Sequence, residues 1–282
     1  MITFIGMGLL GSNFTKALLK QGNTVQVWNR THEKAVALES AGAKAIQDIR
    51  QAVKGIQRIH LTLSDDASVD NVLAAAEPAL EKGCFILDHT TTSMQGAIDR
   101  TRNWAEKGIH YVHVPVFMGP ANALESTGYM LISEAAPILG QVLPMIRPMT
   151  GKVLQYGTNT GRAAAIKLMG NSFLITMTTG IADMLGVAKS MGVPNEDITN
   201  LFENWNAGAT APARLARMLS GKYDQPSWEL QMSRKDARLM LEVAEAAGKQ
   251  LAILPACATE MDRWLAKGMA EKDWTIIGSE HL

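Results

Sequence analysis

Residues 2–11 decide the fold, and they read Ile2-Thr3-Phe4-Ile5-Gly6-Met7-Gly8-Leu9-Leu10-Gly11. An apolar run of strand character leads into three glycines, and a helical pattern follows at once. In such a turn the first glycine permits the tight bend, the second lets the backbone approach a pyrophosphate, and the third lets the helix pack closely on the strand. The positive end of the helix would attract the phosphates. We therefore predict a dinucleotide-binding turn, against the alternative of a purely structural glycine turn, made of Gly6, Met7, Gly8, Leu9, Leu10 and Gly11.

The end of the next predicted strand indicates which dinucleotide is bound. About 20 residues beyond the glycines, a site for NAD(H) usually carries Asp or Glu for the ribose 2′-hydroxyl. This chain has Asn29-Arg30-Thr31 there. A carboxylate would repel a 2′-phosphate, whereas a guanidinium beside an amide and a hydroxyl donates several hydrogen bonds to it. We predict NADP(H) as the preferred cofactor, bound by Asn29, Arg30 and Thr31; NAD(H) stays open, as does the alternative that Arg30 is a solvated loop cation.

From this turn to about residue 160, short apolar runs alternate with helical patterns. The alternation is typical of βαβ units, and continuously apolar, β-branched strands indicate a parallel sheet that is covered on both faces. Strands are predicted at 2–5, 24–28, 43–46, 58–63, 85–88 and 111–115, with helices at 12–21, 33–40, 67–81 and 94–107. A strand near 129–133, a helix at 136–145 and a strand near 152–156 would complete this domain.

Beyond Gly161 the strand patterns end and the chain is helical. Residues 162–191 predict one helix of about 30 residues, on the order of 45 Å long, whose small residues suit burial by neighbouring helices. Further helices are predicted at 196–204, 213–220, 230–248 and 252–267, with a last turn or two at 274–282. We predict an α/β protein: an N-terminal Rossmann-like doubly wound sheet (residues 1–161), joined by a long interdomain helix to an all-α C-terminal domain (residues 162–282).

Composition and charge exclude several classes of protein. Lys and Arg (27) balance Asp and Glu (27), so the basic excess of a nucleic-acid-binding protein is missing. The most apolar stretch, 168–188, contains an amide and a carboxylate and predicts a buried helix, not a membrane span. Cys84 and Cys257 are far apart, which indicates a reducing compartment; with no basic segment before the apolar start, we expect a cytoplasmic protein. His110 and His113 would lie on opposite faces of a strand, so we expect no metal site.

The beginning of the long helix carries a candidate catalytic pair. Lys167 and Asn171 are four residues apart and therefore project from one helix face. Their neighbours are largely apolar, and an ammonium held against apolar surface loses hydration, so its pKa falls toward working pH. Such a group can donate a proton to a carbonyl oxygen while hydride arrives at the carbon. Taken alone, a Lys–Asn pair on a helix is more often a pair of exposed surface residues without a catalytic role.

Further segments fall in a recognisable order along the whole chain. Beside the glycine turn stand Asp88-His89-Thr90-Thr91-Thr92-Ser93, Pro115-Val116-Phe117-Met118-Gly119, Gly161 with Lys167 and Asn171, and Lys235-Asp236. They are similar to an Asp-x-Ser-Thr motif, a Pro-Val-Ser-Gly-Gly loop, a Gly-x₅-Lys-x₃-Asn motif and a Lys-Asp pair. Together they resemble the β-hydroxyacid dehydrogenase family, the group of 3-hydroxyisobutyrate dehydrogenases and of glyoxylate and succinic-semialdehyde reductases.

The resemblance implies roles for these residues. Lys167 would be the catalytic acid/base and Asn171 would orient the substrate, which Thr90, Gly119 and Asp236 would also contact. Thr91 would lie near the nicotinamide, and His89 would face away from the substrate. The cofactor would be bordered by Leu63, Ser64 and Ser68, and Lys235 would close over it from the second domain. The family places its active site in the cleft between domains and often dimerises, so we expect a homodimer or homotetramer.

Two departures from the family pattern bear on the substrate. Thr90 replaces a serine, which keeps the hydroxyl, and Phe117-Met118 replace Ser-Gly in the loop that commonly touches the substrate acid. Whether these two side chains line the pocket or face the core stays open. We expect an oxidoreductase that transfers hydride between NADPH and a small aldehyde or keto acid. The alternatives are an NADPH-dependent imine reductase, whose relatives usually carry Asp or Tyr where Lys167 stands, and a non-catalytic cofactor-binding sensor.

Overall fold

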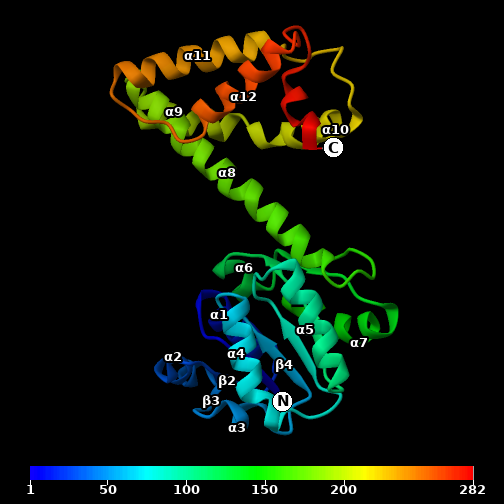
Figure 1. Ribbon diagram of the computed structural model, residues 1–282. Coiled ribbons are helices and arrows are strands. Elements are labelled where there is room, and N and C mark those ends of the chain that lie inside the picture. Colours follow the sequence, from blue (N-terminus) through cyan, green and yellow to red (C-terminus); the bar gives the residue numbers. More distant parts are fainter. Residues whose placement is uncertain (282) are drawn as a thin grey trace. The chain divides into compact units, whose positions relative to one another are not determined.

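The protein is described by a computed structural model, in which residues 1–281 are placed and divide into two compact units, Met1–Asn171 and the residues from Ser172 onward (Figure 1). A six-stranded parallel sheet forms the centre of the first unit, in the order β3-β2-β1-β4-β5-β6. This is the strand order of a dinucleotide-binding Rossmann fold. The strands are β1 (Ile2–Ile5), β2 (Val25–Trp28), β3 (Lys44–Ala45), β4 (Arg58–Leu61), β5 (Phe85–Asp88) and β6 (His110–His113).

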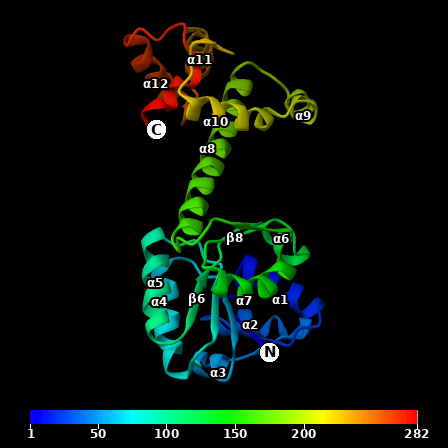
Figure 2. The same ribbon diagram turned by 90° about the vertical axis from the view of Figure 1, so that its right-hand side faces the viewer.

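Helices cover both faces of this sheet, as the apolar strands predict. Figure 2 shows α4 and α5 on one side and α1 and α7 on the other, and each side has its own core of buried residues. One core is built around Phe4, Phe14 and Leu18, the other around Ile59, Leu73 and Trp104. The helices are α1 (Leu9–Lys20), α2 (His32–Val36), α3 (Ile49–Val53), α4 (Asp66–Ala76), α5 (Met94–Glu106), α6 (Pro120–Glu125) and α7 (Ala136–Ile146).

The parallel sheet and its helices are confirmed, as are the strands and the helix predicted near 129–133, 136–145 and 152–156, but one strand bound and one added strand differ from the prediction. The strand expected at 111–115 ends at His113, because Pro115 has no N–H for a ladder. An unpredicted strand β7 (Val116–Phe117) follows, and it pairs antiparallel with β8 (Tyr129–Ile132), which pairs parallel with β9 (Lys152–Gln155). These three strands form a separate small sheet, and β8 and β9 do not extend the large one.

Two short helices, α3 and α6, were not predicted because five or six residues show no helical period. Hydrogen bonds and a proline at their N-termini define these two helices instead. The Asp48 carboxylate accepts a hydrogen bond from the N–H of Arg50 at the start of α3. At α6, Pro120 occupies the first turn, and the Asn122 side chain accepts a hydrogen bond from the N–H of Gly119. Such contacts satisfy the free donors at a helix N-terminus.

The long helix is α8 (Arg162–Ser190), and its first turns belong to the first unit, so the predicted boundary near Gly161 lies earlier than the division between the two units. The Ser133 hydroxyl accepts a hydrogen bond from the N–H of Ala163. Gly161 lies against Met94 and Ile98 so closely that an added Cβ would come within 2.7 Å of Ile98. These contacts tie the start of α8 to the small sheet and to α5.

The second unit is all helical, as predicted. It holds the rest of α8 with α9 (Asn195–Asn204), α10 (Ala211–Ser220), α11 (Leu230–Ala246), α12 (Leu254–Ala266) and the 3₁₀ segment Trp274–His281. Its core gathers Leu230, Met261, Trp264 and Ile276. The buried Asp273 carboxylate accepts hydrogen bonds from Ser227 and Thr275 and pairs with Arg217. No helix within residues 1–281 has both the length and the hydropathy that a membrane span requires.

Candidate functional site

The glycine turn combines two close backbone approaches with one open position. Gly6 has φ +93°, a region that favours glycine, and a Cβ there would lie 2.2 Å from the carbonyl oxygen of Thr62. A Cβ on Gly11 would lie 1.9 Å from the carbonyl oxygen of Gly6, so this glycine lets α1 pack on the turn. Gly8 caps the N-terminus of α1, and open space surrounds the position of its missing Cβ. The turn therefore presents bare backbone and a helix N-terminus to any anion placed there.

A groove of about 860 Å³ runs along the carboxyl ends of β1, β2 and β4. Of the residues predicted to bind the cofactor, ten line it: Gly6, Gly8, Leu9, Leu10, Asn29, Arg30, Thr31, Leu63, Ser64 and Ser68. Met7 does not line it; this residue is buried, and its N–H donates to the Asn29 side chain. The groove is lined both by the backbone of the glycine turn and by cationic side chains such as that of Arg30. Its shape and its hydrogen-bond donors therefore fit a dinucleotide.

Sequence reasoning missed several residues of this groove, notably Trp28, Lys34, Asp65 and Asn71. Lys34 follows Arg30 by four residues, across the start of α2, so both cations border the groove. The available signal was that a second cation follows Arg30 closely in the sequence, at the start of a helix beside the predicted 2′-phosphate site. Asp65 caps α4 by accepting from the N–H of Ser68, which fixes the loop that borders the groove.

Thr90 holds two loops together. Its hydroxyl oxygen accepts a hydrogen bond of 2.9 Å from the N–H of Leu63, and its own N–H donates to Asp88 at 2.8 Å. The side chain is 1% exposed. The structure thus places Thr90 between the groove and the loop after β5, while the next residue, Thr91, is partly exposed.

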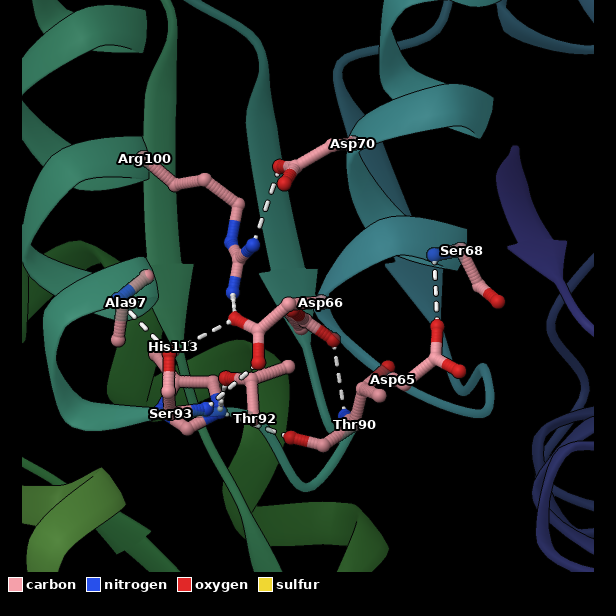
Figure 3. A network of polar contacts seen from close by, with 12 residues as sticks. Asp65, Asp66, Ser68, Asp70, Thr90, Thr92, Ser93, Ala97, Arg100 and His113 are labelled. Carbon is pink, nitrogen blue, oxygen red and sulfur yellow. Dashed lines mark hydrogen bonds and ion pairs between the residues drawn. The ribbon is translucent and has the colours of Figure 1, made fainter.

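A buried arginine of α5 organises the same loop (Figure 3). Arg100 of α5 pairs with Asp66 and with Asp70 of α4, and its Nε donates to the Tyr111 hydroxyl at 3.1 Å. Tyr111 in turn donates to Asp88 at 2.5 Å. Asp66 also accepts from the N–H and hydroxyl of Ser93, which caps α5. The network clamps both ends of the loop 88–93 onto one guanidinium.

Removing the Tyr111 hydroxyl is therefore expected to destabilise the first unit. In Tyr111→Phe, Asp88 and the Nε of Arg100 each lose a buried partner, and an unsatisfied buried group costs about 1–3 kcal/mol. Urea unfolding of the variant measures the loss. Tyr129→Phe, at an exposed tyrosine of β8, is the matched control. Equal stability of Tyr111→Phe and the control would show that the hydroxyl adds nothing to the clamp.

His89 is buried and belongs to a chain of buried rings. Arg58 donates to His60, His60 lies 2.8 Å from His89, and His89 contacts the carbonyl oxygen of Val114 at 2.9 Å. Burial lowers the pKa of His89 to about 4 and that of His60 well below its usual value. Both rings are therefore neutral near pH 7, and since a carbonyl only accepts, each ring donates from its Nδ1.

Lys167 lies where α8 crosses the small sheet. The residue is 8% exposed, its Nζ lies 4.3 Å from the centre of the Phe117 ring, and burial lowers the pKa of the ammonium. Within residues 1–281 no carboxylate lies within ion-pair distance of it. Asn171, one helical turn further along α8, is partly exposed. The side chains of Phe117 and Met118 lie in different surroundings. Phe117 packs under Lys167, whereas Met118 lines the groove.

The other predicted substrate and cofactor residues lie before α6 and on α11. The N–H of Gly119 donates to the Asn122 side chain at the start of α6, and Gly119 does not line the groove. Lys235 and Asp236 lie on α11 of the second unit, where they form an ion pair of 2.9 Å. Their approach to the cofactor or substrate stays a prediction. Within residues 1–281 no group of three or more His, Cys, Asp or Glu side chains gathers as a metal site would require.

Comparisons with known protein families cover nearly the whole chain. Residues 1–157 match the NAD binding domain of 6-phosphogluconate dehydrogenase, and residues 161–278 match the NAD-binding domain model of NADP-dependent 3-hydroxyisobutyrate dehydrogenase. A relative, 2-(hydroxymethyl)glutarate dehydrogenase from Eubacterium barkeri, is 22% identical over 98% of this chain and 93% of its own length. The 6-phosphogluconate dehydrogenase of Klebsiella pneumoniae is 27% identical over 73% of this chain and 47% of its own.

Solved structures share the fold over the full length. An imine reductase from Myxococcus stipitatus in complex with NADP⁺ has a TM-score of 0.89 at 24% identity, covering 98% of each chain. A reductive aminase from Aspergillus terreus in complex with NADPH and ethyl levulinate has a TM-score of 0.92 at 22% identity, covering 100% of this chain and 99% of its own. At these identities the likeness shows the fold alone. The family models cover both halves in order, the first spanning more than half of the chain, and the chain therefore belongs to the β-hydroxyacid dehydrogenase family, as an oxidoreductase that uses a nicotinamide dinucleotide.

Proposed function

We propose that this protein is an NADPH-preferring reductase of small aldehydes or keto acids, or the corresponding hydroxy-acid dehydrogenase in reverse, with Lys167 as its general acid. The observation that carries the proposal is a buried ammonium with no carboxylate partner among the described residues. A buried charge is costly unless it is paired, so its retention favours a use in chemistry. When bound, NADPH supplies the hydride that reduces the carbonyl carbon.

The side chains around Lys167 then divide the work. Lys167 donates the proton to the carbonyl oxygen. Because burial lowers its pKa, the ammonium is a stronger acid than an ordinary lysine and gives up this proton more readily near neutral pH. Asn171, on the same face of α8, orients the substrate through its amide. Thr91, a partly exposed residue, offers its hydroxyl from the loop 88–93, and Thr90 keeps that loop against Leu63. Lys235, Asp236 and Gly119 are assigned to the same site by family resemblance.

An imine reductase is the second candidate, supported by the fold shared with enzymes of that name and by the bulky Phe117 and Met118. The charge of Lys167 weighs against it, because a protonated imine is a cation and an ammonium beside it repels it. Oxidation of NADPH and NADH with glyoxylate, succinic semialdehyde, a 2-methyl-3-oxo acid and a cyclic imine separates the candidates. Aldehyde turnover supports the proposal; turnover of the imine alone supports the second candidate. Cofactor binding without turnover of any of them supports a sensor.

The preference for NADPH is assigned to the cations beside the groove. Replacing Arg30 by alanine is expected to raise KM for NADPH about 10- to 100-fold and to leave KM for NADH nearly unchanged, because a charged hydrogen bond is worth about 1.5–3 kcal/mol and only NADPH has the 2′-phosphate. Steady-state kinetics with both cofactors measure it. Arg102→Ala, an exposed arginine of α5 outside the groove, is the control. A parallel rise for both cofactors would remove the assignment.

We also propose that the chain self-associates as a homodimer or homotetramer. Within this single chain α8 is not enclosed as its small residues led us to expect, and it leaves large apolar side chains exposed, with Phe173 at 57% and Ile175 at 67%. Large exposed apolar surface usually marks an interface. Light scattering at several protein concentrations gives the mass in solution, and a monomer at all of them would contradict the proposal.

A further inference from the structure

The ring of Phe117 is fixed by a glycine of α8. Phe117 ends β7 and stands opposite Tyr129 of β8 in the small sheet. A Cβ on Gly170 would lie 2.3 Å from the Cζ of Phe117 and 2.8 Å from its Cε1. Only glycine therefore lets the ring lie this close to the helix backbone. Gly170 is three residues beyond Lys167, which places the ring under the same helix face that carries the ammonium.

The Phe117 ring also contacts the charged ammonium of Lys167. The Nζ lies 4.3 Å from the ring centre, within the range of a cation–π contact, and such contacts strengthen where water is excluded. A phenyl face has no hydrogen-bond acceptor in the usual sense, so it holds the ammonium without consuming its N–H donors. The donors of Lys167 are thereby left for a carbonyl oxygen.

The same ring gives the surroundings of Lys167 a definite chemical preference. Its face carries partial negative charge and no donor. A carboxylate placed against it gains no hydrogen bond and loses its water. If the carboxylate pairs with Lys167 instead, it competes with the carbonyl oxygen for the N–H donors of the ammonium. An uncharged substituent meets neither obstacle and packs on the ring.

We propose that Phe117 determines substrate specificity, making this enzyme a reductase of carbonyl compounds with an uncharged, apolar substituent in preference to those that carry a carboxylate. The inference rests on the proposed function and narrows it to the uncharged aldehydes and ketones, away from the keto acids that the proposed function also allows. It assigns to Gly170 the task of positioning the ring. Specificity of this kind comes from leaving the wrong substrate with an unpaired buried group.

A matched pair of substrates tests the inference: succinic semialdehyde and its methyl ester, which differ only in whether the far end is charged. The wild type is expected to show a kcat/KM on the order of tenfold or more in favour of the ester. Phe117→Ser, which replaces the ring by a hydroxyl, is expected to abolish or reverse this preference. Phe117→Leu, which keeps an apolar side chain, is expected to retain it.

Gly170→Ala provides a second route to the same answer without changing Phe117. Alanine suits a helix, and its Cβ would force the ring away from Lys167. The preference for the ester is expected to fall in this variant also, which keeps the test decisive should Phe117→Ser fail to fold. Equal kcat/KM for acid and ester in the wild type, or an unchanged ratio in Gly170→Ala and Phe117→Ser, overturns the inference alone. Absence of turnover with both aldehydes overturns the proposed function and the inference together.

Discussion

Lys167→Met is expected to lower kcat for carbonyl reduction on the order of 10²–10⁴-fold, the usual contribution of a positioned general acid. Methionine is unbranched, apolar and similar in length, so it fills the space over Phe117 and removes the proton donor. Because Lys167 does not line the groove, binding of NADPH is expected to stay unchanged. Single-turnover oxidation of NADPH, with cofactor affinity measured separately by fluorescence, gives both quantities.

The control for this variant lies on the same helix. Lys189→Met makes the identical substitution near the other end of α8, where Lys189 is exposed and donates to Asn195. A rate for Lys167→Met close to that of the control would show that the proton comes from another group. Substrate-loop hydroxyls such as Thr91 would then become the candidates.

The pH dependence of the wild-type reduction rate is a second test of Lys167 as the general acid. Reduction needs Lys167 in its protonated form, and burial lowers its pKa below the ordinary 10.5. The rate is therefore expected to be full at low pH and to fall as pH rises through this lowered pKa. Lys167→Met should lack that descending limb, because the group that titrates is gone. A limb of the same midpoint in the variant would assign it to another residue.

The parts of this site that the sequence could predict are those made by neighbours along the chain. The glycine turn, the groove residues 29–31 and the placement of Lys167 and Asn171 on one helix face depend on spacings of a few residues. The strand order follows from right-handed βαβ units that wind in sequence. Such features need no knowledge of distant contacts, and a single sequence contains them.

The remainder depends on residues that only folding brings together. Arg100 lies in an ordinary helical pattern, and nothing near it in the sequence indicates that Asp66, 34 residues earlier, is its partner. The position of Phe117 likewise follows from a glycine on α8, which in the sequence is indistinguishable from any other small helix residue. Thr90 shows the same limit. Its motif predicts a hydroxyl, but it does not predict that this hydroxyl accepts a hydrogen bond from the N–H of Leu63.

Substituting alanine for Gly8 and for Gly11 is expected to separate cofactor binding from folding. Gly11→Ala places a methyl group 1.9 Å from the carbonyl oxygen of Gly6, and since both partners are backbone, overpacking of this kind costs about 1–3 kcal/mol or more of unfolding free energy. Gly8→Ala meets nothing within 4 Å in the free protein, so it loses only the preference of a helix N-cap for glycine over alanine, and its stability should stay close to that of the wild type. Urea unfolding without cofactor compares the two.

Titration with NADPH then gives the complementary result. In Gly8→Ala the methyl group occupies the approach to the pyrophosphate, and the same overpacking cost of about 1–3 kcal/mol, now felt only with ligand bound, weakens binding by about 5- to 150-fold. A stable Gly8→Ala protein with weakened cofactor binding places the phosphates at the N-terminus of α1, because no contact within the free protein accounts for the loss. Unchanged affinity in that variant would mean that the dinucleotide lies away from the turn, and the roles given to Arg30 and Lys34 at the far end of the groove would fail with it.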